Sequence, residues 1–263
     1  MATVRQIADI IEQLFPPENV CMHDYLGLMT GSFGGKVGKV IVCLDCTRRV
    51  LEEAERCGAE LIVSHHPLIF GSLTSVTDET SAGGIILRAA RSGISVYSAH
   101  TNMDCTTGGI CDYTARLLGI KKTSPLIKIN ENAGLGVVGE LADRTSLRDY
   151  ADFISKKLSD KYVKIYGTDR NIKTVAIVNG AGGDTDLIEA AASAGVDCFV
   201  TGEIKHHAAL RAAELGLNII ETSHYASERV FIPHLAELIA SAAAEKHIEI
   251  QVTASEYESN PAL

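Results

Sequence analysis

The chain has 263 residues, of which 46% are hydrophobic, and its 24 lysine and arginine residues against 33 aspartate and glutamate residues give a net charge of −9. This length can bury a substantial core and suits one large domain or two domains of ordinary size. The acidic balance offers no general attraction to nucleic acid or to an anionic membrane, so neither is an expected partner.

The amino-terminal segment and the cysteines indicate the compartment. Residues 2–15 have the apolar spacing of an amphipathic helix and lack the basic start and long apolar centre of a secretion signal. No uncharged apolar stretch approaches the roughly 20 residues that a membrane helix needs. The seven cysteines are odd in number, and several lie inside apolar runs, which is typical of reduced core residues. We therefore expect a cytoplasmic protein without a membrane segment.

After the break at Pro16-Pro17, the first half of the chain alternates strand patterns with helix patterns. Apolar runs bounded by glycine or a carboxylate predict strands, and apolar residues at helical spacing predict the helices between them. The predicted order is strand 39–45, helix 47–57, strand 59–64, helix 81–92, strand 94–98 and helix 108–118. This alternation indicates parallel strands joined by right-handed crossovers.

The same order returns after a middle segment of short alternating runs that contains one predicted helix, 146–158. The second set is strand 171–180, helix 186–194, strand 195–201, helix 208–215 and a strand that begins at Gly216, followed by helix 228–244 and strand 247–253. The sequence thus predicts an α/β fold of two similar, interlinked lobes with largely parallel sheets flanked by helices. We expect residues 1–125 plus 225–263 in the first lobe and residues 126–224 in the second.

Histidines and carboxylates follow three of the predicted strands. Two segments repeat one pattern, in which a turn glycine, a β-prone apolar run and a histidine precede a carboxylate four positions further on. These segments end in His100 with Asp104 and in His224 with Glu228, and a third cluster places His65 and His66 after another apolar run. Because ligands collect beyond the carboxyl ends of strands in open α/β sheets, these side chains are expected to converge. Such a set of ligands is typical of a paired metal centre.

The ligand types and their spacing narrow the choice of ion. Imidazole with carboxylate suits zinc, iron, manganese, nickel or cobalt rather than calcium. A spacing of four puts a histidine and a carboxylate on one face of a helical turn, where the carboxylate can bridge two ions about 3.5 to 4 Å apart. A single histidine is more often an ordinary surface or core residue, so the prediction depends on the three clusters together. His100 stays open between a ligand and a residue that orients a carboxylate.

Three other groups carry weaker signals. Cys43 and Cys46 have C-x-x-C spacing, but no second pair follows at a suitable distance, and a core role is favoured. The pair His206-His207 could line a pocket or lie at an exposed helix start. The run Gly180-Ala-Gly-Gly183 lies between a strand and a helix, but it lacks a complete nucleotide-binding pattern.

Four motifs, taken in chain order, resemble those of the NIF-three-like proteins, which are also known as GTP cyclohydrolase 1 type 2 homologues. They are Ile-Val-Ser-His65-His66-Pro67, Ser-Ala-His100-Thr-Asn-Met-Asp104, Thr-Gly-Glu203 with His206-His207, and His224-Tyr-Ala-Ser-Glu228-Arg229. The resemblance spans nearly the whole chain, from Val37 to Thr253. The segment between Leu118 and Asn171 is too short for the inserted middle domain of other members, so the chain resembles the compact form.

The resemblance implies a two-lobed subunit with a dinuclear metal centre between the lobes, two divalent ions per subunit, and assembly as a homohexamer. Carried over position by position, the ligands would be His65, His66, Asp104, His224 and Glu228, with Glu228 as the bridge. Many relatives carry a Trp-Asp-Asn-x-Gly-Leu pattern near residues 22–28. This chain keeps the aspartate and the Gly-Leu but lacks the tryptophan and the asparagine, so the role of loop 23–28 stays open.

Two functions from different classes fit these residues. The first is a metal-dependent hydrolase acting on a nucleotide or related small molecule, with ring-opening hydrolysis of GTP as the form that the family name suggests. Two cations would activate a water and polarise the substrate, while His100 or His207 moves a proton. The second is a non-catalytic metal chaperone, sensor or adaptor that binds a protein partner. It stays open because the sequence identifies no nucleophile, substrate-binding arginine cluster or phosphate loop.

Overall fold

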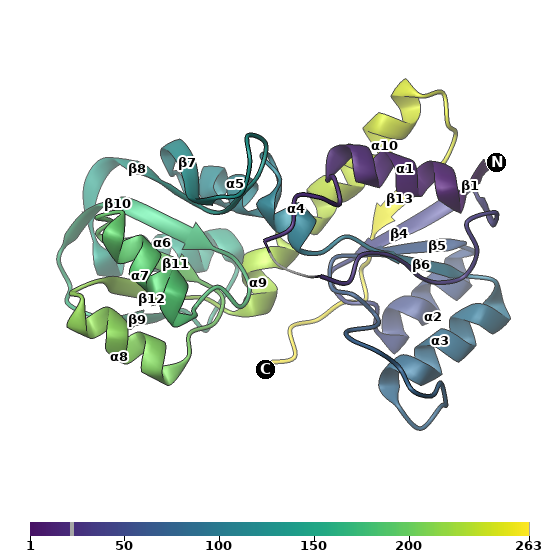
Figure 1. Ribbon diagram of the computed structural model, residues 1–263, viewed down its shortest axis with the longest axis horizontal. Helices are drawn as coiled ribbons and strands as arrows, with labels where there is room; N and C mark the ends of the chain where they lie inside the picture. Colours follow the sequence, from purple (N-terminus) through teal and green to yellow (C-terminus); the bar gives the residue numbers. More distant parts are fainter. Residues whose placement is uncertain (22–23, 263) are drawn as a thin grey trace. The chain divides into compact units, whose positions relative to one another are not determined.

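A computed structural model describes residues 1–21 and 24–262 (Figure 1). The chain divides into two compact units, Met1–Met103 with Ile232–Leu263, and Asp104–Phe231. These boundaries differ from the expected 125 and 225 because residues 104–125 include helix α5 (Ile110–Leu117), whose buried residues belong to the core of the second unit. Met22 and His23, at the start of the loop that departs from the family pattern, lie outside the described residues.

The first unit is built on a five-stranded sheet in the order β13-β4-β5-β6-β2. Strands β13, β4, β5 and β6 run parallel, and β2 at the edge pairs antiparallel with β6. Their bounds are β2 (Gly27–Thr30), β4 (Lys39–Cys43), β5 (Leu61–Ser64), β6 (Ser95–Ser98) and β13 (Gln251–Ala254). Strands β1 (Ala2–Thr3) and β3 (Lys36–Val37) form a separate antiparallel pair. This sheet is largely parallel, as predicted.

Helices cover both faces of this sheet (Figure 1). On one face lie α2 (Arg48–Cys57) and α3 (Ser81–Ser92), whose apolar residues pack in one cluster with Ile41, Ile62 and Val96 of the strands. On the other face lie α1 (Val4–Leu14) and α10 (Ile232–Glu245), which contact each other, and α10 also contacts β4 and β13. Since both faces are covered, the central strands β4 and β5 are nearly continuous runs of buried apolar residues.

The second unit has a six-stranded sheet in the order β7-β8-β10-β11-β12-β9. Its bounds are β7 (Lys121–Lys128), β8 (Gly134–Ser146), β9 (Lys164–Tyr166), β10 (Asn171–Val178), β11 (Cys198–Thr201) and β12 (Asn218–Glu221). Strands β10, β11 and β12 are parallel, while β7, β8 and β9 add antiparallel pairs. This sheet is therefore mixed rather than largely parallel, because the middle segment adds antiparallel strands at its two edges, the β7-β8 pair at one and β9 at the other.

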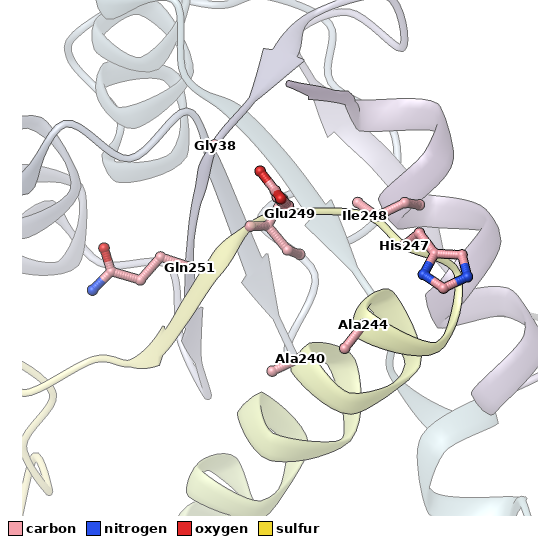
Figure 2. Close-up of a pocket in the computed structure, with 8 residues that line it drawn as sticks. Gly38, Ala240, Ala244, His247, Ile248, Glu249 and Gln251 are labelled. Carbon is pink, nitrogen blue, oxygen red and sulfur yellow. The ribbon is translucent and has the colours of Figure 1, made fainter.

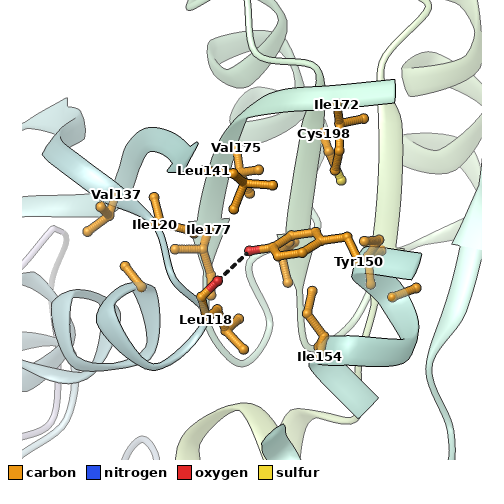
Figure 3. Close-up of a cluster of buried hydrophobic side chains, with 14 of the residues drawn as sticks. Leu118, Ile120, Val137, Leu141, Tyr150, Ile154, Ile172, Val175, Ile177 and Cys198 are labelled. Atoms are coloured by element: carbon orange, nitrogen blue, oxygen red, sulfur yellow. Dashed lines mark hydrogen bonds between the residues drawn. The ribbon is translucent and has the colours of Figure 1, made fainter. Parts of the chain in front are cut away.

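Two helix layers enclose the second sheet. Val175 and Ile177 of β10 pack in one cluster with residues of α5 and of α6 (Leu147–Leu158), where the Tyr150 hydroxyl donates a 3.1 Å hydrogen bond to the Leu118 carbonyl (Figure 3). The alternate residues Ala176 and Val178 pack against α7 (Thr185–Ser193) and α8 (His206–Glu214). This alternation follows from the two-residue period of a strand.

One short helix follows β6 in the chain, and another follows β12. Helix α4 (Thr101–Cys105) begins directly after β6 and His100, and α9 (His224–Arg229) follows β12. The single helix expected over 228–244 is in fact two helices, α9 and α10. Within the described residues, every helix falls short of the length and apolarity that crossing a bilayer requires.

Candidate metal centre

Three imidazoles gather beyond the carboxyl ends of β5 and β6 in the first unit. Strand β5 ends at Ser64, so His65 and His66 lie beyond the strand and avoid the opposite orientations of adjacent strand residues. The candidate ligand atoms of His65, His66 and His100 all lie within 4.8 Å of one another, and the three ring centroids are 5.0 to 5.8 Å apart. The predicted convergence of these histidines is present, and it includes His100.

The Nδ1 atoms of the two adjacent histidines are held by oxygen acceptors. His65, which is fully buried, places Nδ1 3.1 Å from the Ala99 carbonyl. His66 places Nδ1 2.8 Å from a carboxylate oxygen of Asp45. Because these acceptors take a hydrogen from Nδ1, the lone pair of each ring is left on Nε2, as in histidines that bind metals.

His100 is held in the same way by a buried carboxylate. Its Nδ1 lies 2.8 Å from Oδ1 of Asp24, while Oδ2 accepts from the Thr101 amide at 2.9 Å and its hydroxyl at 2.6 Å. Burial by itself would raise the pKa of Asp24, but the hydrogen bonds from His100 and Thr101 outweigh it and hold this pKa well below its ordinary value. Asp24 is therefore an anion that fixes the His100 ring.

The second unit gathers one imidazole and two carboxylates. His224 begins α9, and its Nε2 lies 3.0 Å from Oε2 of Glu228 one turn later, while Glu203 holds Nδ1 at 2.9 Å. Glu228 is only 4% exposed. A carboxylate oxygen of Asp104 in α4 lies within 4.8 Å of one from Glu228. This unit thus contributes mainly anionic oxygen ligands, whereas the first contributes imidazole nitrogens.

The glycine after β10 makes room for this group. Gly180 has φ 59°, and a Cβ there would overlap the Glu228 carboxylate. Its amide donates a 3.0 Å hydrogen bond to the Ser227 hydroxyl, and Asn179 donates to the Ser227 carbonyl. Gly180 therefore serves close packing against α9, and its amide is already occupied.

Other sequence candidates lie apart from these groups. His206 and His207 are exposed in the first turn of α8, and His207 belongs to no candidate metal group within residues 1–21 and 24–262. Cys43 and Cys46 are buried and free, and burial raises the pKa of Cys46 to about 12. A thiol with so high a pKa is a poor metal ligand, which agrees with a core role.

Sequence reasoning missed the carboxylates that hold the rings. Asp45 follows the carboxyl end of β4, so the strand-end rule that identified the histidines could have identified it as well. Glu203 and Asp24 lie in segments that the family resemblance already included. Nothing in the local sequence shows which ring nitrogen each carboxylate faces, because these contacts join residues that are 21 and 76 positions apart.

Cavities adjoin ligands in both units. In the first, a cavity of about 290 Å³ is lined by His66, Asp45 and Arg48 among others. In the second, a cavity of about 120 Å³ is lined by Asp104 and by hydroxyl residues that include Thr106 and Ser124. A further cavity of about 690 Å³ lies between α10 and β13 (Figure 2), and its lining residues include His247, Glu249 and Gln251. None of the residues that line it belongs to a candidate metal group among the described residues. Its size alone therefore does not mark the site.

Comparisons with known proteins agree with the motifs. A family model described as Duf34/NIF3 (NGG1p interacting factor 3) matches residues 2–261. The chain is 36% identical over 229 residues to a GTP cyclohydrolase 1 type 2 homologue of Clostridium perfringens, with 86% of each chain covered. It is 32% identical over 246 residues to a GTP cyclohydrolase 1 type 2 of Helicobacter pylori, covering 92% of this chain and 93% of that protein. The crystal structure of a hypothetical protein of Staphylococcus aureus superposes on this chain with a TM-score of 0.91 and 29% sequence identity, and the match covers 99% of this chain and 98% of that one. The resemblance seen in the motifs is thereby confirmed, and the chain belongs to the Duf34/NIF3 family.

Proposed function

We propose that the chain binds two divalent metal ions in one dinuclear centre and acts as a metal-dependent hydrolase on a nucleotide or related small molecule. The ligands would be His65, His66, Asp104, His224 and Glu228, with Glu228 as the bridge. One observation carries the proposal: the buried Glu228 carboxylate lies within 4.8 Å of the Asp104 carboxylate. Two carboxylates at this range repel each other when both are ionised, and a cation between them removes that cost.

The donor atoms fit the proposed ions. His65, His66 and His100 have Nδ1 held by an oxygen acceptor, so each presents Nε2. His224 also has Nδ1 held, by Glu203, and its Nε2 faces the Glu228 carboxylate at 3.0 Å. Nitrogen donors from one unit and carboxylate oxygens from the other are the mixture that zinc, iron, manganese, nickel and cobalt accept. The fit supports one centre that draws on both ligand sets.

The chain's own residues would divide the work of hydrolysis. When bound, the ions would lower the pKa of a water and polarise the bond under attack. Asp45, Asp24 and Glu203 orient the rings, and His100 is our candidate for moving a proton at Nε2. His207 stays a second candidate, although its exposed position on α8 gives it no observed contact with the ligands.

The names of the relatives suggest the substrate class. Because those proteins are called GTP cyclohydrolase 1 type 2 or its homologues, we propose a nucleotide, with ring-opening hydrolysis of GTP as the most specific form. We propose action in a reducing compartment such as the cytosol, because the chain has an odd number of cysteines, seven, and most of them are buried core residues. Homohexamer formation stays a prediction, which light scattering of the purified protein would check.

A non-catalytic metal chaperone, sensor or adaptor is the second candidate. It is favoured by the exposure of His66 and His224 and of the carboxylates that hold them. Asp45 and Glu203 are about half exposed or more, and the two imidazole rings are themselves partly exposed, so another protein or a chelator could reach a metal ion bound to them. A carrier should release its ions to a competing chelator without losing its fold, whereas a catalytic centre should retain them.

Metal content per chain tests the proposal directly. We expect about two ions per native chain, and a clear reduction in the His65→Ala and Glu228→Ala variants, measured by elemental analysis after dialysis. His234→Ala is a matched control, because His234 also lies near a glutamate, Glu237 at 3.4 Å, on the exposed side of α10. Equal metal content in all four proteins would remove the proposed site.

Activity then separates the two candidate functions. Metal-loaded protein should turn over GTP or a member of a panel of phosphoesters and cyclic amides, and Asp104→Asn and Glu228→Gln should abolish that turnover. Full metal content with no turnover in the whole panel would favour the chaperone, sensor or adaptor.

A further inference from the structure

The loop between β5 and α3 exposes an aromatic side chain next to the histidines of the first unit. Residues 67–80 contain neither helix nor strand, and Phe70 within them is 74% exposed. Long structureless loops in compact domains are usually functional. A phenylalanine this exposed contributes little to the core, so its position calls for another explanation.

The Phe70 ring contacts two residues of the candidate site. Its centroid lies 5.3 Å from the Tyr25 ring at an interplanar angle of 58°, and 6.4 Å from the His100 ring at 84°. Both distances fall within the range of favourable aromatic pairs, and the His100 contact is edge-to-face. Phe70 is therefore oriented by the site, although most of its surface is open.

Asp24 fixes Tyr25 to the same histidine. One oxygen of this carboxylate lies 2.8 Å from the His100 ring nitrogen and also accepts from the Tyr25 amide at 2.8 Å. Tyr25 and His100 thus share one anchor, and the Phe70 ring packs against both of them.

We propose that Phe70 and Tyr25 form a stacking platform for a planar, nitrogen-containing aromatic ring of the substrate, held beside His100. This inference rests on the proposed function, whose substrate it describes more closely. Such rings stack on exposed aromatic side chains without needing a deep pocket, because every heteroaromatic ring has a π face. The platform would set which substrates reach the ions, and the metal ligands would act on the bond that reacts.

A small ring fits these contacts better than a protein surface does. Leu73 and Val76 of the same loop are 43% and 42% exposed, and a protein partner would be expected to cover them together with Phe70. Neither has an aromatic ring that could stack on a ligand, whereas the Phe70 ring lies 6.4 Å from that of His100. Leu73 and Val76 therefore provide matched controls on the same loop.

Binding of guanosine to the full-length, metal-free chain tests the platform. Guanosine supplies the ring without a phosphate, and ribose 5-phosphate supplies the phosphate without the ring. We expect guanosine to bind, ribose 5-phosphate not to compete, and Phe70→Leu and Tyr25→Leu each to raise the dissociation constant about tenfold, measured by calorimetry. Phe70→Tyr should keep the affinity because it keeps the ring, and Val76→Ala should leave the affinity unchanged.

Several results would overturn the platform. These are no guanosine binding at millimolar concentration, equal losses in Phe70→Leu and Val76→Ala, or a change of oligomeric mass in both variants, which would make the loop a contact with a second copy. Because this test uses metal-free protein, its outcome is separate from that of the metal test. If the chain binds guanosine but takes up no ions in the elemental analysis, the proposed metal centre is contradicted and the platform is not.

Discussion

The two units carry the same three parallel strands but place different chemistry at the strand ends. In the first unit, β4 is followed by Asp45, β5 by His65 and His66, and β6 by His100. In the second, β10 is followed by Gly180, β11 by Glu203 and β12 by His224. In both units, the carboxylate that holds a histidine ring follows the strand before the histidine's own strand. Asp45 after β4 holds His66 after β5, and Glu203 after β11 holds His224 after β12. A repeated frame therefore fixes where side chains emerge, but not which of them is ligand or holder.

At the amino ends of the parallel strands, both units have the same stabilising feature, an acidic side chain that accepts hydrogen bonds from two backbone amides. Glu60, just before β5, accepts from the amides of Gly38 and Lys39 at 3.0 and 2.9 Å. Asp197, just before β11, accepts from the amides of Lys173 and Thr174 at 2.8 and 3.0 Å. This end carries no candidate ligand, so the comparison separates a stabilising feature that both units share from the chemistry in which they differ.

The largest effect that would test this difference is expected at Gly180, which follows β10 where Asp45 follows the corresponding strand β4 of the first unit. Gly180→Ala puts a methyl group where the Glu228 carboxylate lies, and we expect metal content to fall to one ion per chain or fewer. Gly195→Ala is the control, because it has a similar φ of 70° with open space around it and bears only the backbone strain of about 1–2 kcal/mol. Equal metal content in both variants would show that the Gly180 contact with Glu228 is unimportant.

A smaller effect would compare the two holders. Asp45→Asn and Glu203→Gln should each weaken metal affinity by roughly 10- to 100-fold, because the imidazole loses the carboxylate that orients it. Competition with a chelator of known affinity measures this change. Glu221→Gln, at the end of β12, is the control, since Glu221 accepts from Tyr166 and Lys164 and holds no imidazole. If only one holder matters, the two half-sites do not contribute equally.

The smallest effect concerns stability at the opposite strand ends. Burial raises the pKa of Asp197, but hydrogen bonds from Thr174 and Lys173 outweigh it and lower this pKa below its ordinary value. Its stabilisation is therefore complete above the unfolded pKa of about 3.9 and is lost as pH falls through the lower folded value. Asp197→Asn should cost about 1–2 kcal/mol at pH 7, and the difference from the native chain should shrink in acid, measured by urea unfolding.

Glu60→Gln gives the matching measurement in the first unit, and a similar loss at pH 7 would support the shared stabilising feature. A loss at Asp197 that stays constant down to pH 2 would contradict the role of its charge.

Much of the strand and helix order could be predicted from the sequence. The β4-α2-β5-α3-β6 series and its copy β10-α7-β11-α8-β12 have apolar runs and helical spacings that local periodicity records. The strands of the middle segment could not be assigned from the sequence, because β7 is mostly exposed and shows no apolar face. Strand β2, in the first unit, was also missed, because its extended conformation depends on its pairing with β6.

The candidate site divides in the same way. Positions after strand ends are local properties, so His65, His66, His100 and His224 could be selected from sequence alone. Their grouping within 4.8 Å, the direction of each Nδ1 and the space that Gly180 leaves for Glu228 depend on contacts between distant segments. Hydrogen bonds and close packing of this kind cannot be predicted from local sequence, because the neighbours of one residue in the chain do not show which distant residue it will contact.

The repeated α/β frame and the residue types at its strand ends follow from local sequence, because hydrophobic periodicity and turn glycines act over a few residues. That Asp24, Asp45 and Glu203 hold rings, and that Phe70 meets Tyr25 beside His100, follows from the fold alone. The two kinds of property differ in range: burial patterns depend on adjacent residues, whereas the orientation of a side chain depends on the distant segments that the fold packs against it.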